Sequence, residues 1–330
     1  IVQFGFGAVG KSFFEKVRKE IKFNEYDYIV ITKDNREFKD YINLGGISTN
    51  FYTIDINKNN FKEAFSKHLS SGDLLIDFAD TIGTLDPCKW CAEKNIMYLN
   101  TGEADWPENW YSIFTENLKK NDLKKEYLND HRYNNFPIVL HHGNNPGLVS
   151  HFTKLAIEYI VKTQFKKDKE LKQLLKENKF NLIAQKLGIR MIHVNDIDTQ
   201  EITEPSKPNK LTNTWCVDTF FFELLSESTQ NIGKHEILND NEKYNLVDKE
   251  KGFLEYKSIA VDNKCHTYYP NGYFNGYLVP HEETITIANS LEVKENDKVI
   301  YRPSVMFIYS PCNIANEYLS AIIVLKEGGY

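Results

Sequence analysis

The sequence predicts an α/β protein in which a doubly wound parallel sheet is followed by a second α+β domain built on a mostly antiparallel sheet. Three observations support this fold class. An apolar strand expected at 1–4 runs directly into three closely spaced glycines. Short apolar strands then alternate with helical patterns, which is typical of a parallel sheet. In the second half, strand-like stretches carry alternating polarity and aromatic residues, as strands of antiparallel sheets do. The length of 330 residues favours two domains, which we place at 1–146 and 147–330.

The glycines near the front of the chain form a G-x-G-x-x-G motif, which indicates a dinucleotide-binding Rossmann unit. The first glycine permits the tight turn out of the strand, the second allows a pyrophosphate to approach the backbone, and the third lets the next helix pack closely. A helix expected at 9–21 directs its first N–H groups and its positive dipole end at the phosphates. The expected cofactor contacts are Gly5, Gly7, Ala8, Val9 and Gly10. The alternative is a glycine turn that binds no ligand.

An acidic residue follows the second expected strand, at 28–32. In dinucleotide-binding units such an acid binds the ribose hydroxyls of NAD. Asp34 occupies this position, although it comes slightly later than the usual spacing and Lys33 stands beside it. The sequence therefore predicts NAD as the cofactor, with NADP as the alternative.

The rest of the first domain continues the alternation of strands and helices. We expect strands at 50–54, 74–78, 96–99 and 137–140, and helices at 61–69, 86–94 and 111–128. Ligands of a parallel sheet bind at the carboxyl ends of its strands. The candidate site segments are therefore the ones just after these strands, namely 80–81, 100–106 and 141–147.

The second half begins with a helix expected at 147–163. A Lys- and Glu-rich segment at 164–187 follows, and we interpret it as a pair of helices with a solvent-facing charged surface. Strand-like stretches then dominate. They lie at 188–195, 212–222, 255–259, 278–280, 284–290 and 305–309.

The composition limits the classes of partner. There are 40 Lys and Arg residues against 46 Asp and Glu, a net charge of -6, whereas a nucleic-acid-binding protein presents a basic face. No apolar run approaches the length of a membrane span, and no signal peptide is visible. We therefore expect a cytoplasmic protein that binds a small molecule, with no nucleic acid and no membrane as partner.

The cysteines and histidines indicate neither a disulfide framework nor a metal site. Five scattered cysteines are an odd, sparse set. Cys88 and Cys91 have the spacing of a redox pair or half of a zinc site, but no second pair accompanies them, so we expect a structural role on a helix. His141, His142, His193 and Glu283 form no compact ligand motif, and we predict no metal.

Seven segments, taken together and in this order, resemble homospermidine synthases, a family within the saccharopine-dehydrogenase-like group. They lie at 4–10, 79–81, 142–152, 192–200, 213–215, 281–283 and 301–305. The most specific is H-G-N-N-P-G-L-V-S-H-F at 142–152, and the resemblance spans essentially the whole chain. It implies an NAD-dependent transfer in which two putrescines give sym-homospermidine and ammonia through imines, with the hydride borrowed and returned by the same NAD. It also implies a homodimer whose second domain binds substrate and joins the subunits.

The resemblance also assigns roles to individual residues. It implies that the catalytic residues are His281, Glu283, Glu103 and Asn145. It implies that the substrate-binding residues are Trp215, Glu223 and Asp196. The expected cofactor contacts are completed by Asp80, Thr81 and Asn144, which follow strands of the first domain.

These residue types suit a diamine, which is cationic at both ends and apolar between them. Carboxylates form charge-assisted hydrogen bonds to ammonium groups, and the face of an indole attracts a cation. His281 and Glu283 are two residues apart, so in an extended segment they point to the same side. A histidine beside a carboxylate has a tunable pKa and can transfer a proton.

Each assignment has an alternative. Asp105 could act in place of Glu103, Asn145 could cap a helix, and Trp215 could be an ordinary core residue. The chain could also be a reductase that closes a Schiff base with an amino acid, as saccharopine reductase and carboxynorspermidine synthase do, or a non-catalytic NAD-binding sensor. A substrate that carries a carboxylate needs arginine in its pocket. The candidate residues here are acids and one tryptophan, which favours a diamine.

Overall fold

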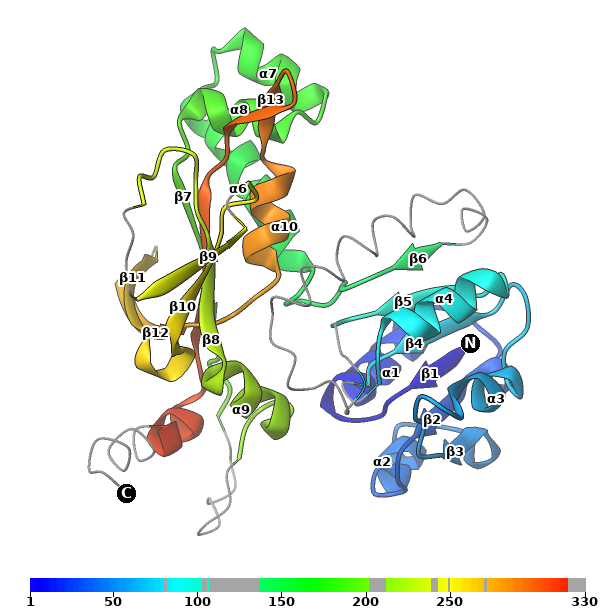
Figure 1. The fold of residues 1–330 in the computed structure, drawn as a ribbon. Helices are drawn as coiled ribbons and strands as arrows, with labels where there is room; N and C mark the ends of the chain where they lie inside the picture. Colours follow the sequence, from blue (N-terminus) through cyan, green and yellow to red (C-terminus); the bar gives the residue numbers. More distant parts are fainter. Residues whose placement is uncertain are drawn as a thin grey trace. The chain divides into compact units, whose positions relative to one another are not determined.

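The structure is a computed structural model that describes residues 1–79, 82–102, 106, 137–201, 212–238, 243–248, 250–269 and 272–319. The chain divides into two compact units, Ile1–Leu148 and Val149–Tyr330 (Figure 1). The division therefore falls close to the boundary expected after residue 146.

The first unit is built on a six-stranded sheet in the order β3-β2-β1-β4-β5-β6, with every neighbouring pair parallel. Its strands are β1 (Val2–Phe4), β2 (Ile29–Thr32), β3 (Phe51–Thr53), β4 (Leu74–Asp77), β5 (Met97–Asn100) and β6 (Ile138–Val139). This is the strand order of a doubly wound dinucleotide-binding fold. The fold class predicted for the first half is confirmed.

Helices cover both faces of this sheet. They are α1 (Ala8–Glu20), α2 (Phe38–Asn43), α3 (Phe61–Ser66) and α4 (Leu85–Glu93), of which α2 was not expected from the sequence. Phe14 of α1 and Tyr41 of α2 share a core with Val30, whereas Phe65 of α3 shares a different core with Ile31. Val30 and Ile31 are neighbours in β2, so their side chains point to opposite faces. The helix expected at 111–128 lies outside the described residues.

The two cysteines of the C-x-x-C pair are packing residues of α4. Cys88 and Cys91 are 3% and 0% exposed and lie in the core beneath the sheet. Burial raises the pKa of the Cys91 thiol, which keeps it in the unreactive protonated form. All five cysteines of the chain are among the described residues, and none is in a disulfide.

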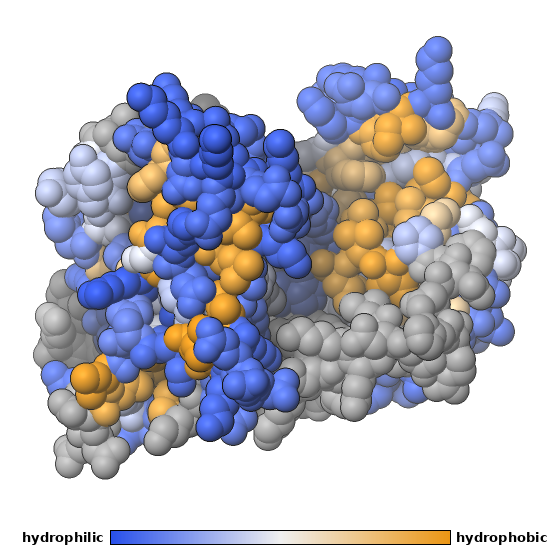
Figure 2. All heavy atoms as spheres, turned by 90° about the horizontal axis from the view of Figure 1, so that it is seen from above, coloured by the Kyte–Doolittle hydropathy of each residue, from blue (hydrophilic) through white to orange (hydrophobic). Residues whose placement is uncertain are grey.

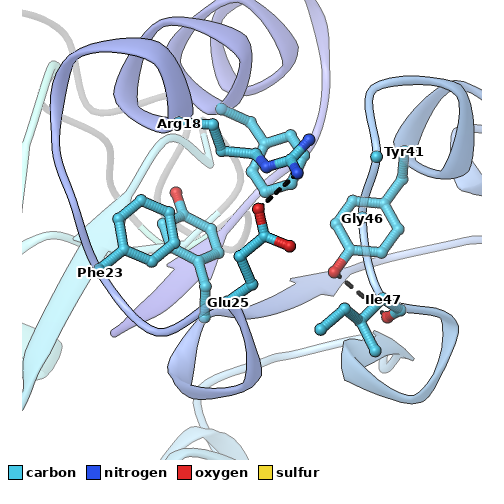
Figure 3. A pocket seen from close by; sticks show the side chains of 9 residues that line it. Arg18, Phe23, Glu25, Tyr41, Gly46 and Ile47 are labelled. Atoms are coloured by element: carbon cyan, nitrogen blue, oxygen red, sulfur yellow. Dashed lines mark hydrogen bonds and ion pairs between the residues drawn. The ribbon is translucent and has the colours of Figure 1, made fainter.

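A small cleft lies between α1 and the segment after α2 (Figure 3). The guanidinium of Arg18 forms an ion pair with Glu25 at 2.6 Å and also contacts the carbonyl of Leu44. The hydroxyl of Tyr41 donates to the carbonyl of Ile47 at 3.3 Å. The contact with Leu44 holds the end of α2 against α1, and the bond to Ile47 closes the segment after α2 onto Tyr41.

The second unit centres on a seven-stranded sheet in the order β11-β12-β15-β8-β10-β9, with β7 added beside β15. β7 runs parallel to β15 and the other pairs are antiparallel, so the mostly antiparallel sheet predicted from the sequence is confirmed. The strands are β7 (Met191–Ile197), β8 (Glu227–Asn231), β9 (Tyr244–Asp248), β10 (Phe253–Ile259), β11 (Lys264–Tyr269), β12 (Gly272–Leu278) and β15 (Ser304–Ser310). A separate hairpin is formed by β13 (Val293–Glu295) and β14 (Lys298–Tyr301).

The helices of this unit are α6 (Leu148–Gln164), α7 (Lys169–Lys176), α8 (Phe180–Leu187), α9 (Val217–Leu225) and α10 (Glu283–Ser290). The helix and the helical pair expected over 147–187 are confirmed. Val161 of α6, Phe220 of α9 and Ala288 of α10 share one core with Val305 and Phe307 of β15. In Figure 1 the helices α6 and α10 run along the same side of this sheet.

The prediction of a strand at 212–222 is wrong, because α9 occupies most of this stretch. Its apolar run V-D-T-F-F-F-E-L-L has no alternation that separates a strand from a helix. Phe220 and Leu224 are four residues apart, about one helical turn, and both are fully buried. The helical period therefore places both side chains in the core.

The prediction of a strand at 284–290 is also wrong, because α10 covers it. Its β-branched residues favour a strand by propensity. Thr284, Ile287, Ala288 and Leu291 are nevertheless buried, at the i, i+3, i+4 and i+7 spacing of one helix face. Packing against β15 and β8 outweighs the local preference.

Hydrophilic side chains cover much of the face seen in Figure 2, with apolar side chains gathered between them. This agrees with a sequence that is 26% charged and 41% hydrophobic. Among the described residues, no helix is both long and apolar enough to cross a membrane.

Candidate active site

The glycine turn after β1 has the geometry that a dinucleotide requires. Gly5 has φ +91°, and a Cβ there would lie 3.0 Å from the carbonyl carbon of Phe78. A Cβ on Gly10 would lie 2.4 Å from the carbonyl oxygen of Gly5, so α1 packs too closely on the turn for any side chain. Gly7 differs from both, because a Cβ there would meet nothing within 4 Å. Its backbone is open to a ligand.

The start of α1 is exposed at this turn. Gly7, Ala8 and Val9 are all exposed, and Gly7 is the N-cap without a side-chain cap. The first N–H groups of the helix are thus available to an anion, which the positive end of the helix dipole favours. The residues expected from the motif lie together at the carboxyl end of β1.

Gln3 is a residue of this turn that the sequence analysis missed. Its side chain is fully buried, and Nε2 donates to the carbonyl oxygens of Gly5 at 2.9 Å and Gly10 at 3.1 Å. Its Oε1 accepts from the hydroxyl of Tyr28 at 2.6 Å. The signal in the sequence is a polar residue in an otherwise apolar strand directly before the glycines.

Asp34 lies just beyond β2, where the ribose of a dinucleotide is expected. Its carboxylate forms an ion pair with Arg36 at 2.7 Å and accepts from the backbone N–H of Arg36 at 2.9 Å. The hydrogen bonds from Arg36 lower the pKa of Asp34. Arg36 was not singled out from the sequence, and it holds this acid ionised.

The turn after β6 contains Asn144 and Asn145. The backbone N–H of Gly143 donates to the carbonyl of Pro146 at 2.7 Å, which closes the turn. Asn100, at the end of β5 and 2% exposed, accepts from the N–H of His141 at 2.8 Å. α6 begins at Leu148, so the N-cap position falls after Asn145, and the capping alternative for this residue is wrong. The turn stands at the same sheet edge as the glycine turn, because all six strands are parallel.

Asp80, Thr81 and Glu103 lie outside the described residues, as does Asp105. β4, the strand before Asp80 and Thr81, has a well-anchored end. Asp77 is 4% exposed and accepts from the hydroxyl of Tyr98 at 2.8 Å and from the N–H of Ala79 at 3.0 Å.

The second unit holds an ion pair between His281 and Glu283. Nδ1 of His281 contacts Oε2 of Glu283, and the two side chains are 13% and 2% exposed. The spacing in the sequence predicts this contact from an extended segment, and that reason is wrong, because Glu283 is the first residue of α10. The pair meets at the start of a helix, where the dipole also favours a carboxylate.

The electrostatics of this pair hold a proton on the imidazole. Burial is the largest single influence and lowers the pKa of His281, but it is opposed by the charge and hydrogen bond of Glu283 and by the charges of Glu223 and Glu282. Together they raise the pKa of His281 to about 9. At neutral pH the histidine is therefore a cation with a proton to donate.

Glu223 is the second titrating group of this cluster. It is half-buried on α9 and directly follows the exposed end of the aromatic run. Burial is the largest influence on the pKa of Glu223, and with smaller contributions from Asp196 and Glu283 it raises this pKa to about 7 against the opposing charge of His281. A carboxyl group with this pKa can hold or release a proton near neutral pH.

Trp215 lies in the turn before α9 and not in a strand. It is half-buried, and its Nε1 donates to the hydroxyl of Tyr309 at 2.9 Å. Its ring meets Phe220 edge-on with centroids 5.9 Å apart. Tyr309 pairs in register with Asp196 of β7, so the tryptophan and this carboxylate flank the same tyrosine.

The structure thus gathers two sets of expected residues, one in each unit. The first contains the glycine turn, Asp34 and the turn with Asn144 and Asn145. The second contains Trp215, Glu223, Asp196, His281 and Glu283. The charged groups that shift the pKa of Glu223 are the carboxylates of Asp196 and Glu283 and the imidazole of His281. Those that shift the pKa of His281 are the carboxylates of Glu223, Glu282 and Glu283. Within the described part of the chain, no guanidinium is among these groups. Such an acidic cluster beside an indole suits a cationic ligand.

No metal centre is found in the part of the chain that the structure describes, where no three His, Cys, Asp or Glu side chains are grouped to hold an ion. His193 lies on β7 with Nδ1 3.2 Å from the hydroxyl of Thr267. It belongs to the second unit, whereas His141 and His142 belong to the first.

Comparison with known proteins extends this description. Residues 1–133 match the family model of the saccharopine dehydrogenase NADP binding domain. Homospermidine synthase from Mesorhizobium japonicum is 26% identical over 327 residues, covering 96% of this chain and 66% of the relative. Homospermidine synthase from Blastochloris viridis is 23% identical over 333 residues, covering 96% of this chain and 67% of the relative.

Solved structures agree with these relatives. Homospermidine synthase from Legionella pneumophila, in complex with NAD, superposes with a TM-score of 0.83 and 26% identity, covering 99% of this chain and 68% of that one. Apo saccharopine dehydrogenase (L-Glu forming) from Saccharomyces cerevisiae has a TM-score of 0.50 and 10% identity, covering 98% of this chain and 57% of that one, and shares the fold alone.

The sheet order and the glycine turn define a dinucleotide-binding first unit, and this unit is the part that matches the saccharopine dehydrogenase NADP binding domain. Along nearly its whole length the chain is similar to homospermidine synthases, and it spans about two thirds of their length.

Proposed function

We propose that this chain catalyses an NAD-dependent transfer of an aminobutyl group, converting two putrescines to sym-homospermidine and ammonia. The observation that carries the proposal is the cluster of Glu223, His281 and Glu283 beside Trp215, in a chain homologous to homospermidine synthases along nearly its whole length. This cluster supplies acids and an indole for a diamine, and it contains a proton donor and a proton acceptor with pKa values near the working range.

The residues of the first unit fit NAD. The open backbone at Gly7 and the uncapped start of α1 receive the pyrophosphate, and the ionised Asp34 receives the ribose hydroxyls. Bound there, NAD would supply the acceptor and donor of the hydride that this reaction needs. Asp34 supports NAD over NADP, because its negative charge repels a 2′-phosphate. The NAD in the Legionella pneumophila homologue agrees with this choice.

The second unit receives the substrate. Carboxylates at Asp196 and Glu223 attract the ammonium groups, and the half-buried indole of Trp215 attracts a cation. Trp215 acts here as a substrate contact and also packs against the core, so its two interpretations are compatible. The apolar middle of a diamine suits the aromatic side chains around it.

The proton transfers fall to Glu223 and His281. Oxidation of the amine to an imine requires removal of one proton from nitrogen, and Glu223 with a pKa of about 7 can accept it. The amine of a second putrescine then adds to the imine carbon. Departure of ammonia requires a proton on the leaving nitrogen, which His281 with a pKa of about 9 can supply. Return of the hydride to the new imine completes sym-homospermidine.

The direct test is incubation of the purified protein with NAD and putrescine deuterated at the carbons that carry the amines. We expect sym-homospermidine that keeps all of its deuterium, equimolar ammonia, and no net NADH. Turnover only after addition of a keto acid or amino acid would instead indicate a Schiff-base reductase. NAD binding without any turnover would indicate a sensor.

We also propose that the chain is a cytoplasmic homodimer that forms through the second unit, with the first unit holding the cofactor. The resemblance to homospermidine synthases supports the dimer. Sedimentation equilibrium of the purified protein tests it, and a monomer at micromolar concentration would contradict it.

A further inference from the structure

The hydrogen bond between Trp215 and Tyr309 joins two residues that are far apart in the chain. Nε1 of Trp215 donates to the hydroxyl oxygen of Tyr309 at 2.9 Å. The two rings also touch, with centroids 6.3 Å apart and planes inclined by 63°. Tyr309 is therefore the residue that engages the polar atom of the indole.

Tyr309 is itself firmly placed. It lies in β15, is 5% exposed, and pairs in register with Asp196 of the parallel strand β7. Phe220 packs against its ring with centroids 6.4 Å apart. Burial raises the pKa of the Tyr309 hydroxyl, and Asp198, Glu223 and Asp196 raise it further, so the hydroxyl stays neutral.

We propose that Tyr309 is a positioning residue for the substrate: it fixes the indole of Trp215 as the surface on which an ammonium group of the diamine rests. This inference rests on the proposed function, because it assigns to Trp215 a cationic substrate. It adds a residue that the sequence analysis did not single out, on a strand distant in sequence from the tryptophan.

Two physical effects make the hydrogen bond matter for a cation. Attraction between a cation and an indole depends on the cation lying over the ring face, so a ring that can rotate loses part of it. In addition, an N–H that donates a hydrogen bond is polarised by its acceptor, as in any chain of hydrogen bonds. That polarisation makes the indole ring more electron-rich toward a cation.

The backbone at Trp215 is held from the other side. The hydroxyl of Thr214 contacts the carboxylate of Asp198, just beyond β7, and Phe220 meets the indole edge-on. The ring is therefore located by packing, and Tyr309 sets its orientation. Loss of the Tyr309 hydroxyl should leave the fold intact but allow the indole ring of Trp215 to rotate.

The test uses Tyr309→Phe, which removes the hydroxyl and keeps the ring. We expect KM for putrescine to rise about five- to tenfold, the loss expected for one buried hydrogen bond, with kcat within about twofold and Kd for NAD unchanged. The matched control is Tyr301→Phe. Its hydroxyl donates to the carbonyl of Ile189 at 2.7 Å, so it also loses a tyrosine hydrogen bond, but it should leave KM unchanged.

A binding measurement separates this inference from the proposed activity. Protein loaded with NADH cannot oxidise putrescine, so calorimetric titration with putrescine gives a Kd without turnover. We expect the same five- to tenfold weakening in Tyr309→Phe, and no further weakening when that change is added to Trp215→Phe. If wild-type protein binds putrescine but makes no homospermidine, the proposed function fails while this inference stands.

Four results would overturn the inference. One is an unchanged Kd in Tyr309→Phe. Another is an equal loss in Tyr301→Phe, which would show that the effect is general destabilisation. The third is an additive loss in the double variant, and the fourth is no binding of putrescine by wild-type protein.

Discussion

The imidazole of His281 lies face to face with the ring of Phe307, with centroids 4.0 Å apart and planes inclined by only 14°. This stacking fixes the plane of the imidazole, and the contact with Glu283 engages Nδ1. β15 and the start of α10 together therefore fix the orientation of the imidazole.

Glu283→Gln should weaken the protein and inactivate it. The change leaves the His281 cation buried beside a neutral amide, and loss of one partner of a buried pair costs about 3 kcal/mol. The pKa of His281 should fall from about 9 toward its ordinary value, because the nearest negative charge is gone. We expect activity to fall about a hundredfold or more.

Titration of His281 by NMR and thermal unfolding measure these two effects. Glu282→Gln is the matched control, because it removes a neighbouring carboxylate that contributes less to the pKa of His281. An unchanged pKa of His281 in the Glu283 variant would refute this interpretation of the pair.

Activity should depend on pH through two groups. Glu223 ionises with a pKa of about 7, so the affinity for a diammonium substrate should rise as the pH passes through this value. His281 loses its proton with a pKa of about 9, so kcat should decline above that pH. In Glu223→Gln the rise near pH 7 should disappear while the alkaline decline stays. If the rise near pH 7 persists in Glu223→Gln, another group is responsible for it.

Stability should fall on the alkaline side for a related reason. Folding raises the pKa of His281 above its ordinary value of 6.5, so the stabilisation from its protonation is complete below about pH 6.5. It is lost as the pH rises to about 9. We expect the melting temperature of the second unit to drop over this interval by about 2–4 °C per kcal/mol lost. In His281→Gln the slope over the same interval should be smaller, and an equal slope would contradict the assignment.

Two glycines of the turn should respond differently to the same substitution. In Gly10→Ala the new Cβ meets the carbonyl of Gly5 at 2.4 Å, so the first unit should lose about 1–3 kcal/mol. In Gly7→Ala the Cβ meets no protein atom, so stability should not change. NAD binding should weaken about tenfold in Gly7→Ala, because the new methyl group occupies the place where the pyrophosphate is expected to approach the backbone. Equal melting temperatures for the two variants, or unchanged NAD affinity in Gly7→Ala, would contradict this description of the turn.

Local patterns predicted the first unit well, because its short apolar strands, its glycine turn and its helix boundaries each depend on residues that are close together in the sequence. The second unit was harder. In α10 a β-branched run favours a strand, and only burial of Thr284, Ile287 and Ala288 on one face explains the helix. No local signal in the sequence reports which distant strand a segment packs on.

The candidate site shows the same limit. The pairing of His281 with Glu283 was predicted, but for the wrong reason, since the contact depends on a helix start and not on an extended segment. The partners Phe307 and Tyr309 were not predicted, because they reach His281 and Trp215 only after β15 is assembled in the sheet. Gln3 and Arg36 were overlooked although each lies within a few residues of a predicted site position.

The ion pair of Asp34 with Arg36 should determine the choice between NAD and NADP. Asp34→Ser removes the acceptor for the ribose hydroxyls, and loss of a charge-assisted hydrogen bond should weaken NAD binding about tenfold to a hundredfold. The same change frees Arg36 from its partner at 2.7 Å, and an arginine at this place accommodates a 2′-phosphate. NADP binding should therefore strengthen in this variant and return to the wild-type level when Arg36→Ala is added. Titrations of NADH and NADPH by fluorescence measure both effects, and Lys33→Ala controls for the loss of a nearby charge. If Asp34→Ser keeps the wild-type preference for NAD, the acid does not select the cofactor.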